Sequence, residues 1–196
     1  MSLDLEIQSL LRSPQVNEIN FNMRGILVTG QGYLELSNCF SDQAIRHRIR
    51  VTVRPELVSP GAVAEYLPGP DKICLRSNMV FQIPVWRSDI VHECTHAQID
   101  LRAVATPIQN EEGAAFIAQA WYMLASNVDQ AWIDQIVTTE IREIATDLRA
   151  QSLLPGGPVQ VSQNQIEVAR RMMLQFGYRS GHYTSNGIRG LRYSGA

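Results

Sequence analysis

The stretch His92-Glu93-Cys94-Thr95-His96 constrains the chain more than any other. In an α-helix, residues four apart lie on one face, about one turn from each other. Two imidazoles at this spacing can bind one metal ion, and a glutamate beside the first histidine can reach a water molecule on that ion. The motif therefore predicts a helix that carries a Zn²⁺ site, with His92 and His96 as metal ligands and Glu93 as the general base.

Composition limits the chain to a folded, globular class. Of its 196 residues, 45% are hydrophobic and 18% are charged, which is typical of globular domains. A net charge of −2 gives no general attraction to nucleic acid or anionic membrane. No apolar run reaches the roughly 18 residues of a membrane-spanning helix. We therefore expect one domain, with neither nucleic acid nor a membrane as partner; the sequence does not define an oligomeric state.

The cysteines and the N-terminus bear on cellular location. Cys39, Cys74 and Cys94 are odd in number and far apart, which argues against a disulfide framework and against a paired-cysteine metal site. The first six residues are acidic and lack the basic region of a signal peptide. We expect a cytoplasmic protein, although a protein exported without a cleaved signal would show the same N-terminus.

The first half of the chain shows mainly β patterns after a short amphipathic helix over residues 3–12. The pattern predicts extended segments over 26–36 with a turn at Gly30-Gln31-Gly32, a strand over 48–54, and a hairpin of 63–67 with 72–76. In the strand over 48–54, Ile49, Val51 and Val53 alternate with arginines and are expected to face a core.

The second half changes to helical periodicity. We predict helices from Ser88 or Asp89 to about 102, from Asn110 to about 124, over 128–151 with Trp132 in the core, and over 161–176. Residues 178–196 have the composition of an irregular tail. The order predicts the α+β class: a small antiparallel or mixed β-sheet within residues 20–84, followed by a helical half over 85–177.

A catalytic zinc site needs a third protein ligand, with the fourth position left to water. No histidine follows at the spacing H-E-x-x-H-x-x-G-x-x-H, because Ile99 and Arg102 occupy the places of the glycine and the third histidine. Glu111 and Glu112 lie 15 and 16 residues after His96, which leaves room for the chain to turn back. Either glutamate is a candidate third ligand.

With these residues the chain resembles the gluzincins, metallopeptidases with H-E-x-x-H on one helix and a glutamate ligand on the next. The match covers residues 72–124, about a quarter of the chain. The resemblance implies a single zincin-like domain over residues 1–196, a Zn²⁺ cofactor, and a peptide or protein substrate. It also implies an edge strand, around Ile73 and Leu75, beside the cleft.

The resemblance favours Glu112 as the third metal ligand. Small bacterial zincin-like proteins often show a glutamate, two residues, an alanine and an aromatic residue, and this pattern falls on Glu112, Ala115 and Phe116. Against this, three alanines follow Glu111 at helical spacing and would allow close helix packing. The choice between the two glutamates therefore stays open.

Other parts of the gluzincin pattern are absent or displaced. Thermolysin-type enzymes have an aspartate four residues after the ligand glutamate, and this chain has none there, so the group that orients the metal ligand is in doubt. Asp100 is a candidate to orient an imidazole, with a solvated helix charge as the alternative. The resemblance also implies a histidine or tyrosine that stabilises the oxyanion, and His182 and Tyr183 are the candidates.

The leading hypothesis is a zinc-dependent metallopeptidase in which Glu93 takes a proton from the attacking water and passes it to the leaving nitrogen. One alternative is a non-catalytic or regulatory zincin-like module that binds a partner. Another is a secreted bacterial protease effector.

Overall fold

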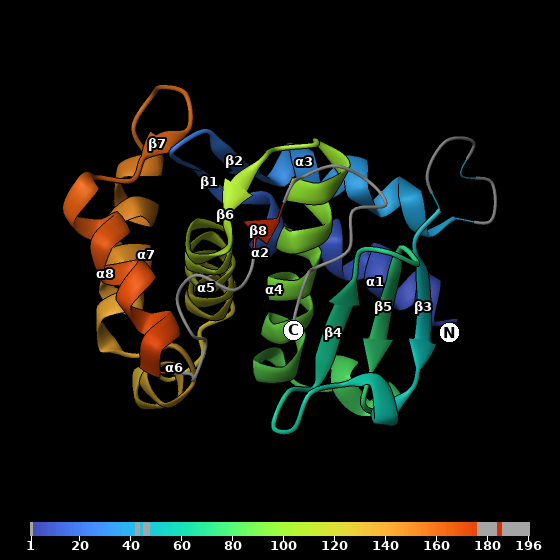
Figure 1. Ribbon diagram of the computed structural model, residues 1–196. Helices are drawn as coiled ribbons and strands as arrows, with labels where there is room; N and C mark the ends of the chain where they lie inside the picture. Colours follow the sequence, from blue (N-terminus) through green and yellow to red (C-terminus); the bar gives the residue numbers. More distant parts are fainter. Residues whose placement is uncertain (1, 42–43, 45–47, 176–183, 186–196) are drawn as a thin grey trace.

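Two long helices at the centre of the molecule carry the motif and the two glutamates. In this computed structural model, which describes residues 2–41, 44, 48–175 and 184–185, α4 (Pro84–Leu101) packs beside α5 (Ile108–Ala125) (Figure 1). α4 starts at Pro84, because the fixed φ of proline suits the first helical position and keeps Ile83 extended. The predicted start at Ser88 or Asp89 is therefore too late in the chain.

The remaining elements surround this helix pair, and the architecture is α+β, as predicted. α6, α7 and α8 lie on the far side of α5, and a three-stranded sheet lies on the far side of α4 (Figure 1). The helices are α1 (Leu3–Leu11), α2 (Pro14–Asn17), α3 (Gly30–Ser37), α6 (Gln130–Val137), α7 (Thr139–Ser152) and α8 (Gln163–Gln175), with 3-10 turns η1 (Asn38–Phe40), η2 (Pro55–Leu57) and η3 (Asn78–Phe81). The strands are β1 (Asn20–Met23), β2 (Ile26–Thr29), β3 (Arg50–Val53), β4 (Ala64–Leu67), β5 (Lys72–Leu75), β6 (Thr106–Pro107), β7 (Val159–Gln160) and β8 (Thr184–Ser185).

The sheet beside α4 has the strand order β3-β5-β4. The predicted hairpin is confirmed, since β4 pairs antiparallel with β5, whereas β3 pairs with β5 in parallel. β5, the strand of Ile73, is thus central, and β4 is the edge strand that packs on α4. The expectation that the strand around Ile73 lies at the cleft edge is wrong. Ile49 is buried and Val51 packs against the core, as expected, whereas Val53 at the end of β3 is 40% exposed, so its predicted place in the core is wrong.

The segment after β2 is a helix and not the extended strand predicted from its sequence. Thr29 caps α3 through its hydroxyl, which accepts a hydrogen bond from the Gly32 N–H at 3.1 Å. A Cβ at Gly30 would collide with the backbone of Asn17, and one at Gly32 would meet the ends of the Arg102 and Gln98 side chains, which would have to move. The two glycines therefore permit close approach to neighbouring chain segments, and they do not form a turn.

The long helix predicted over 128–151 is two helices, α6 and α7. Thr138 separates them with φ of +77°, a conformation that a β-branched residue rarely adopts. The break rotates α6 so that Ile133 is fully buried and Trp132 is 59% exposed. The prediction of Trp132 as a core residue is therefore wrong.

One continuous cluster of buried apolar side chains runs through the described residues, from Ile7 in α1 to Ala169 in α8. Trp121 of α5 is fully buried in it and stacks on Phe21 of β1 with ring centroids 6.1 Å apart. α5 is thus the central element against which the smaller ones pack. In the described part of the chain, no helix combines the length and apolar character needed to cross a membrane.

Candidate metal centre

The two histidines of the motif lie on one face of α4 and point at a common position. His92 and His96 are 8% and 5% exposed, and their Nε2 atoms lie 3.2 Å apart. One helical turn separates the two residues, which is the geometry that the spacing predicts.

Glu112 of α5 faces both imidazoles. Its Oε2 lies 3.3 Å from Nε2 of His92, and its Oε1 lies 3.7 Å from Nε2 of His96. Ligand atoms of all three residues lie within 4.8 Å of one another, and no other cluster of this kind occurs among the described residues. The three side chains, hereafter the metal centre, are buried and come from two adjacent helices.

Glu111 faces the outer side of the same site. Its Oε1 lies 2.8 Å from Nδ1 of His96, the ring nitrogen turned away from Glu112. The sequence left both glutamates as candidate ligands. The structure places the two glutamates differently. Glu112 faces the converging Nε2 atoms, whereas Glu111 is hydrogen-bonded to Nδ1 on the opposite side of the His96 ring.

His92 is held in the same way by a residue that the sequence interpretation missed. Oε1 of Gln119 lies 3.2 Å from its Nδ1, while the amide Nε2 of Gln119 donates to Oδ1 of Asp89. Because the amide nitrogen faces a carboxylate, the amide oxygen must face the histidine, so Nδ1 is the donor. Gln119 lies seven residues after Glu112, two helical turns along the same face, and that spacing was the available signal.

These hydrogen bonds decide whether the site suits a cation. Both Nδ1 atoms face acceptors, so in neutral rings both Nε2 atoms carry lone pairs. Two lone pairs and a carboxylate would repel one another at these distances unless a positive charge lies between them. Two imidazoles and one carboxylate are also the donor set of several catalytic zinc sites, so the residues fit the metal.

The electrostatics of the metal-free site also indicate a place for a positive charge. Burial alone would lower the pKa of His96, but the carboxylates of Glu112 and Glu111 raise it well above its usual range. Burial opposes ionisation of Glu112, yet His96 and His92 lower the pKa of Glu112 below its usual range. Without a metal ion, a proton on His96 therefore balances the buried carboxylates.

Glu93 lies on the neighbouring face of α4, towards the sheet. The backbone N–H of Tyr66 in β4 donates to its Oε2 at 2.7 Å. Burial raises the pKa of Glu93, while His92, His96 and the Tyr66 N–H oppose that rise. No pattern in the sequence marks Tyr66, because the contact joins α4 to a strand 27 residues earlier.

Asp100 does not have either role considered from the sequence. It is 7% exposed, so it is not a solvated charge, and its Oδ2 accepts a hydrogen bond from the Tyr66 hydroxyl at 2.9 Å rather than from an imidazole. Burial raises the pKa of Asp100, and the tyrosine hydrogen bond opposes this. Tyr66 is thus attached to α4 at both its backbone and its hydroxyl.

Phe116 occupies the place where thermolysin-type enzymes have an aspartate. Its ring meets His92 edge-on, with centroids 4.6 Å apart, and it is 8% exposed. Because Phe116 is apolar, the hydrogen bond that orients His92 comes from Gln119. Cys94, between the two histidines in the motif, is fully buried.

The two oxyanion candidates, His182 and Tyr183, lie outside the described residues. The next residues, Thr184 and Ser185, form β8, which pairs antiparallel with β6 just before α5.

Comparison of the chain with models of known protein families, with curated proteins and with solved structures gives no match. The resemblance to gluzincins therefore rests on the residues of the motif and of α5.

Proposed function

We propose that the chain is a zinc-dependent metallopeptidase of the gluzincin type, with His92, His96 and Glu112 as zinc ligands. The observation that supports this proposal is that two Nε2 atoms and one carboxylate converge on one position. Both outer Nδ1 atoms are hydrogen-bonded to acceptors. A zinc ion held there would supply a Lewis acid and lower the pKa of a water molecule.

Glu93 is the general base in this proposal. Tyr66 holds Oε2 of Glu93 from the β4 side, so Oε1 is the oxygen that takes the proton from the attacking water. A base needs a pKa near the working pH, and burial raises that of Glu93 towards it. Glu93 then delivers the proton to the leaving amine.

β4 supplies a surface for an extended substrate. Val63 accepts a hydrogen bond from the N–H of Arg76, so in this antiparallel pair Ala64 and Tyr66 direct their backbone groups away from β5. That edge faces the Glu93 side of α4, as the Tyr66 hydrogen bond shows. An extended peptide that pairs with Ala64 would cross the metal centre, which supports a peptide as the substrate.

The same Tyr66 hydrogen bond favours a second candidate, a metal-binding module without catalysis. A backbone N–H that stabilises the carboxylate of Glu93 lowers its basicity. In this second candidate, the fold binds a metal ion and a partner segment at β4 without hydrolysis.

The substitution Glu93→Gln separates the two candidates. The amide cannot accept a proton as a base, yet it leaves the three ligands intact, so the metallopeptidase predicts unchanged zinc content and loss of cleavage. Mass spectrometry of a peptide library before and after incubation measures cleavage, and elemental analysis measures zinc. Glu143→Gln, an exposed change on α7, is the matched control. Cleavage that survives Glu93→Gln refutes the role of Glu93, and its absence in the zinc-loaded wild type supports the module.

A further inference from the structure

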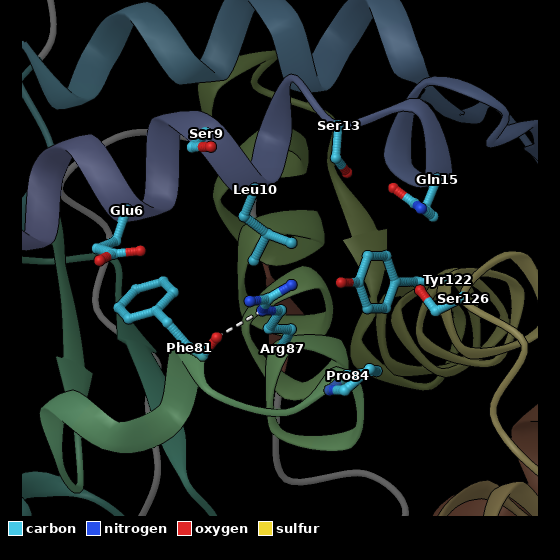
Figure 2. Close-up of a pocket in the computed structure, with 10 residues that line it drawn as sticks. All are labelled: Glu6, Ser9, Leu10, Ser13, Gln15, Phe81, Pro84, Arg87, Tyr122 and Ser126. Carbon is cyan, nitrogen blue, oxygen red and sulfur yellow. Dashed lines mark hydrogen bonds between the residues drawn. The ribbon is translucent and has the colours of Figure 1, made fainter.

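A cavity lies away from the metal centre, between α1, α4 and the C-terminal end of α5. It has a volume of about 240 Å³ and is lined by residues that include Glu6, Phe81, Arg87, Tyr122 and Ser126 (Figure 2). We call it the α1 cavity. Its volume is below the roughly 300–1,000 Å³ typical of pockets for drug-sized ligands, so a matching ligand is small.

Arg87 presents unused hydrogen-bond donors to the α1 cavity. Its Nε–H donates to the carbonyl of Phe81 at 2.6 Å, which fixes the plane of the guanidinium (Figure 2). Among the described residues, neither Nη atom has a hydrogen-bond or ion-pair partner, although the side chain is only half-exposed. A fixed guanidinium with a free Nη edge is suited to bind a carboxylate through two parallel hydrogen bonds.

Two hydroxyl groups from the end of α5 complete this side of the cavity. Tyr122 is 3% exposed and directs its hydroxyl towards Arg87 (Figure 2). Oγ of Ser126 is buried and has no hydrogen-bond partner in the described structure. A buried hydroxyl without a partner costs about 1–3 kcal/mol, and a bound polar group would remove that cost.

Glu6 of α1 adds the opposite charge to the lining. Its carboxylate forms no ion pair with Arg87 or with any other described residue. The cavity therefore offers one cation and one anion, neither of which has an ion-pair partner among the described residues. A ligand with a single charge would leave one of them unbalanced, and a dianion such as phosphate would be repelled by Glu6.

We propose that the α1 cavity binds a small zwitterion with the chemistry of an amino acid or dipeptide. The carboxylate of the ligand pairs with the Nη edge of Arg87 and accepts from the Tyr122 hydroxyl, and its ammonium group balances Glu6. This site does not depend on the proposed metallopeptidase function, because none of its residues belongs to the metal centre.

Nuclear magnetic resonance titration of the full chain tests the proposal. The probes are glycine, L-alanine, L-leucine and glycylglycine, with acetate, methylammonium and inorganic phosphate as fragments that lack one charge or carry an excess. We expect at least one zwitterion to shift the resonances of Arg87 and Tyr122 and to bind about tenfold or more tightly than every fragment. Absence of binding by all four zwitterions, or equal or tighter binding of acetate or phosphate, overturns the proposal.

Three variants locate the binding. Arg87→Lys keeps the positive charge but loses the two parallel N–H donors of the guanidinium, and we expect about tenfold weaker binding of the zwitterion. Tyr122→Phe removes one donor, with about threefold weaker binding expected, and Glu6→Gln removes the preference for the zwitterion over acetate. Arg50→Lys, an exposed change on β3, is the matched control and leaves affinity unchanged. If Arg87→Lys disturbs the fold, the other two variants decide; unchanged affinity and preference in both refutes the site.

Discussion

The helix pair α4–α5 contributes polar residues to two places, the metal centre and the α1 cavity, and the two differ in how those residues are satisfied. At the metal centre, Nδ1 of each imidazole faces a hydrogen-bond acceptor, from Glu111 or Gln119. Asp89 in turn accepts a hydrogen bond from the Gln119 amide. In the α1 cavity, the Nη edge of Arg87 and Oγ of Ser126 have no partner among the described residues.

This difference separates a preorganised site from an adaptable one. Side chains at the metal centre are fixed before a metal ion arrives, which lowers the reorganisation needed for binding. Groups in the α1 cavity keep unused hydrogen-bonding capacity, so a ligand can supply the missing partners. Substitutions at the metal centre should therefore cost affinity or stability, whereas some substitutions in the α1 cavity should cost little.

The largest expected effect comes from the neighbouring glutamates. Glu112→Ala removes a proposed ligand and should reduce zinc affinity by far more than the 10–100-fold typical of outer partners. Glu111→Ala removes a hydrogen-bond partner of His96 and leaves the three proposed ligands in place, so the loss should fall within that range. Competition with a chromophoric chelator measures both affinities. Equal losses, or a larger loss in Glu111→Ala, would show that the two roles are assigned the wrong way round.

Gln119→Leu should have the next largest effect. The change keeps the volume but removes the acceptor that fixes His92, so we expect zinc affinity to fall about 10–100-fold. The same chelator competition measures it, and circular dichroism checks that α5 still folds. Gln135→Leu, a change of the same type on α6, is the control. Unchanged affinity in Gln119→Leu would mean that Phe116 packing alone orients the imidazole.

Local patterns predicted much of the fold and the inner part of the metal centre. The i, i+4 histidines, the C-terminal ends of α4 and α5 and the β4–β5 hairpin follow from spacing and turn residues that act within a few positions. The outer contacts did not follow, because Gln119–His92 and Tyr66–Glu93 join residues 27 positions apart through tertiary packing. Gly32 was misinterpreted for the same reason: its need for space arises from α4, far along the chain.

Asp89 provides a smaller, pH-dependent test. Burial raises its pKa to about 6, above the value near 4 of an unfolded chain. The folded protein therefore binds this proton more tightly, and the resulting stabilisation is complete below about pH 4 and is lost as the pH rises through 6. Asp89→Asn cannot ionise, so the metal-free variant should exceed the wild type in unfolding free energy by up to about 3 kcal/mol at pH 8.

Urea unfolding in the presence of a chelator, at pH 4 and at pH 8, measures this difference. The advantage of Asp89→Asn should nearly vanish at pH 4, where Asp89 of the folded protein is neutral. An advantage of equal size at both pH values would assign it to packing and not to ionisation.

The smallest expected effect lies in the α1 cavity and tests the comparison directly. Ser126→Ala removes a buried hydroxyl that has no partner, so the unfolding free energy should stay within about 0.5 kcal/mol of wild type or rise slightly. Ser37→Ala is the matched change at a satisfied hydroxyl, which donates to the Leu34 carbonyl at 2.7 Å and accepts from Arg12 at 2.9 Å. That variant should lose about 1 kcal/mol or more in the same urea unfolding experiment. A comparable loss in Ser126→Ala would mean that its hydroxyl already has a partner in solution, and Arg87 would then be the only one of the two groups that separates the α1 cavity from the metal centre.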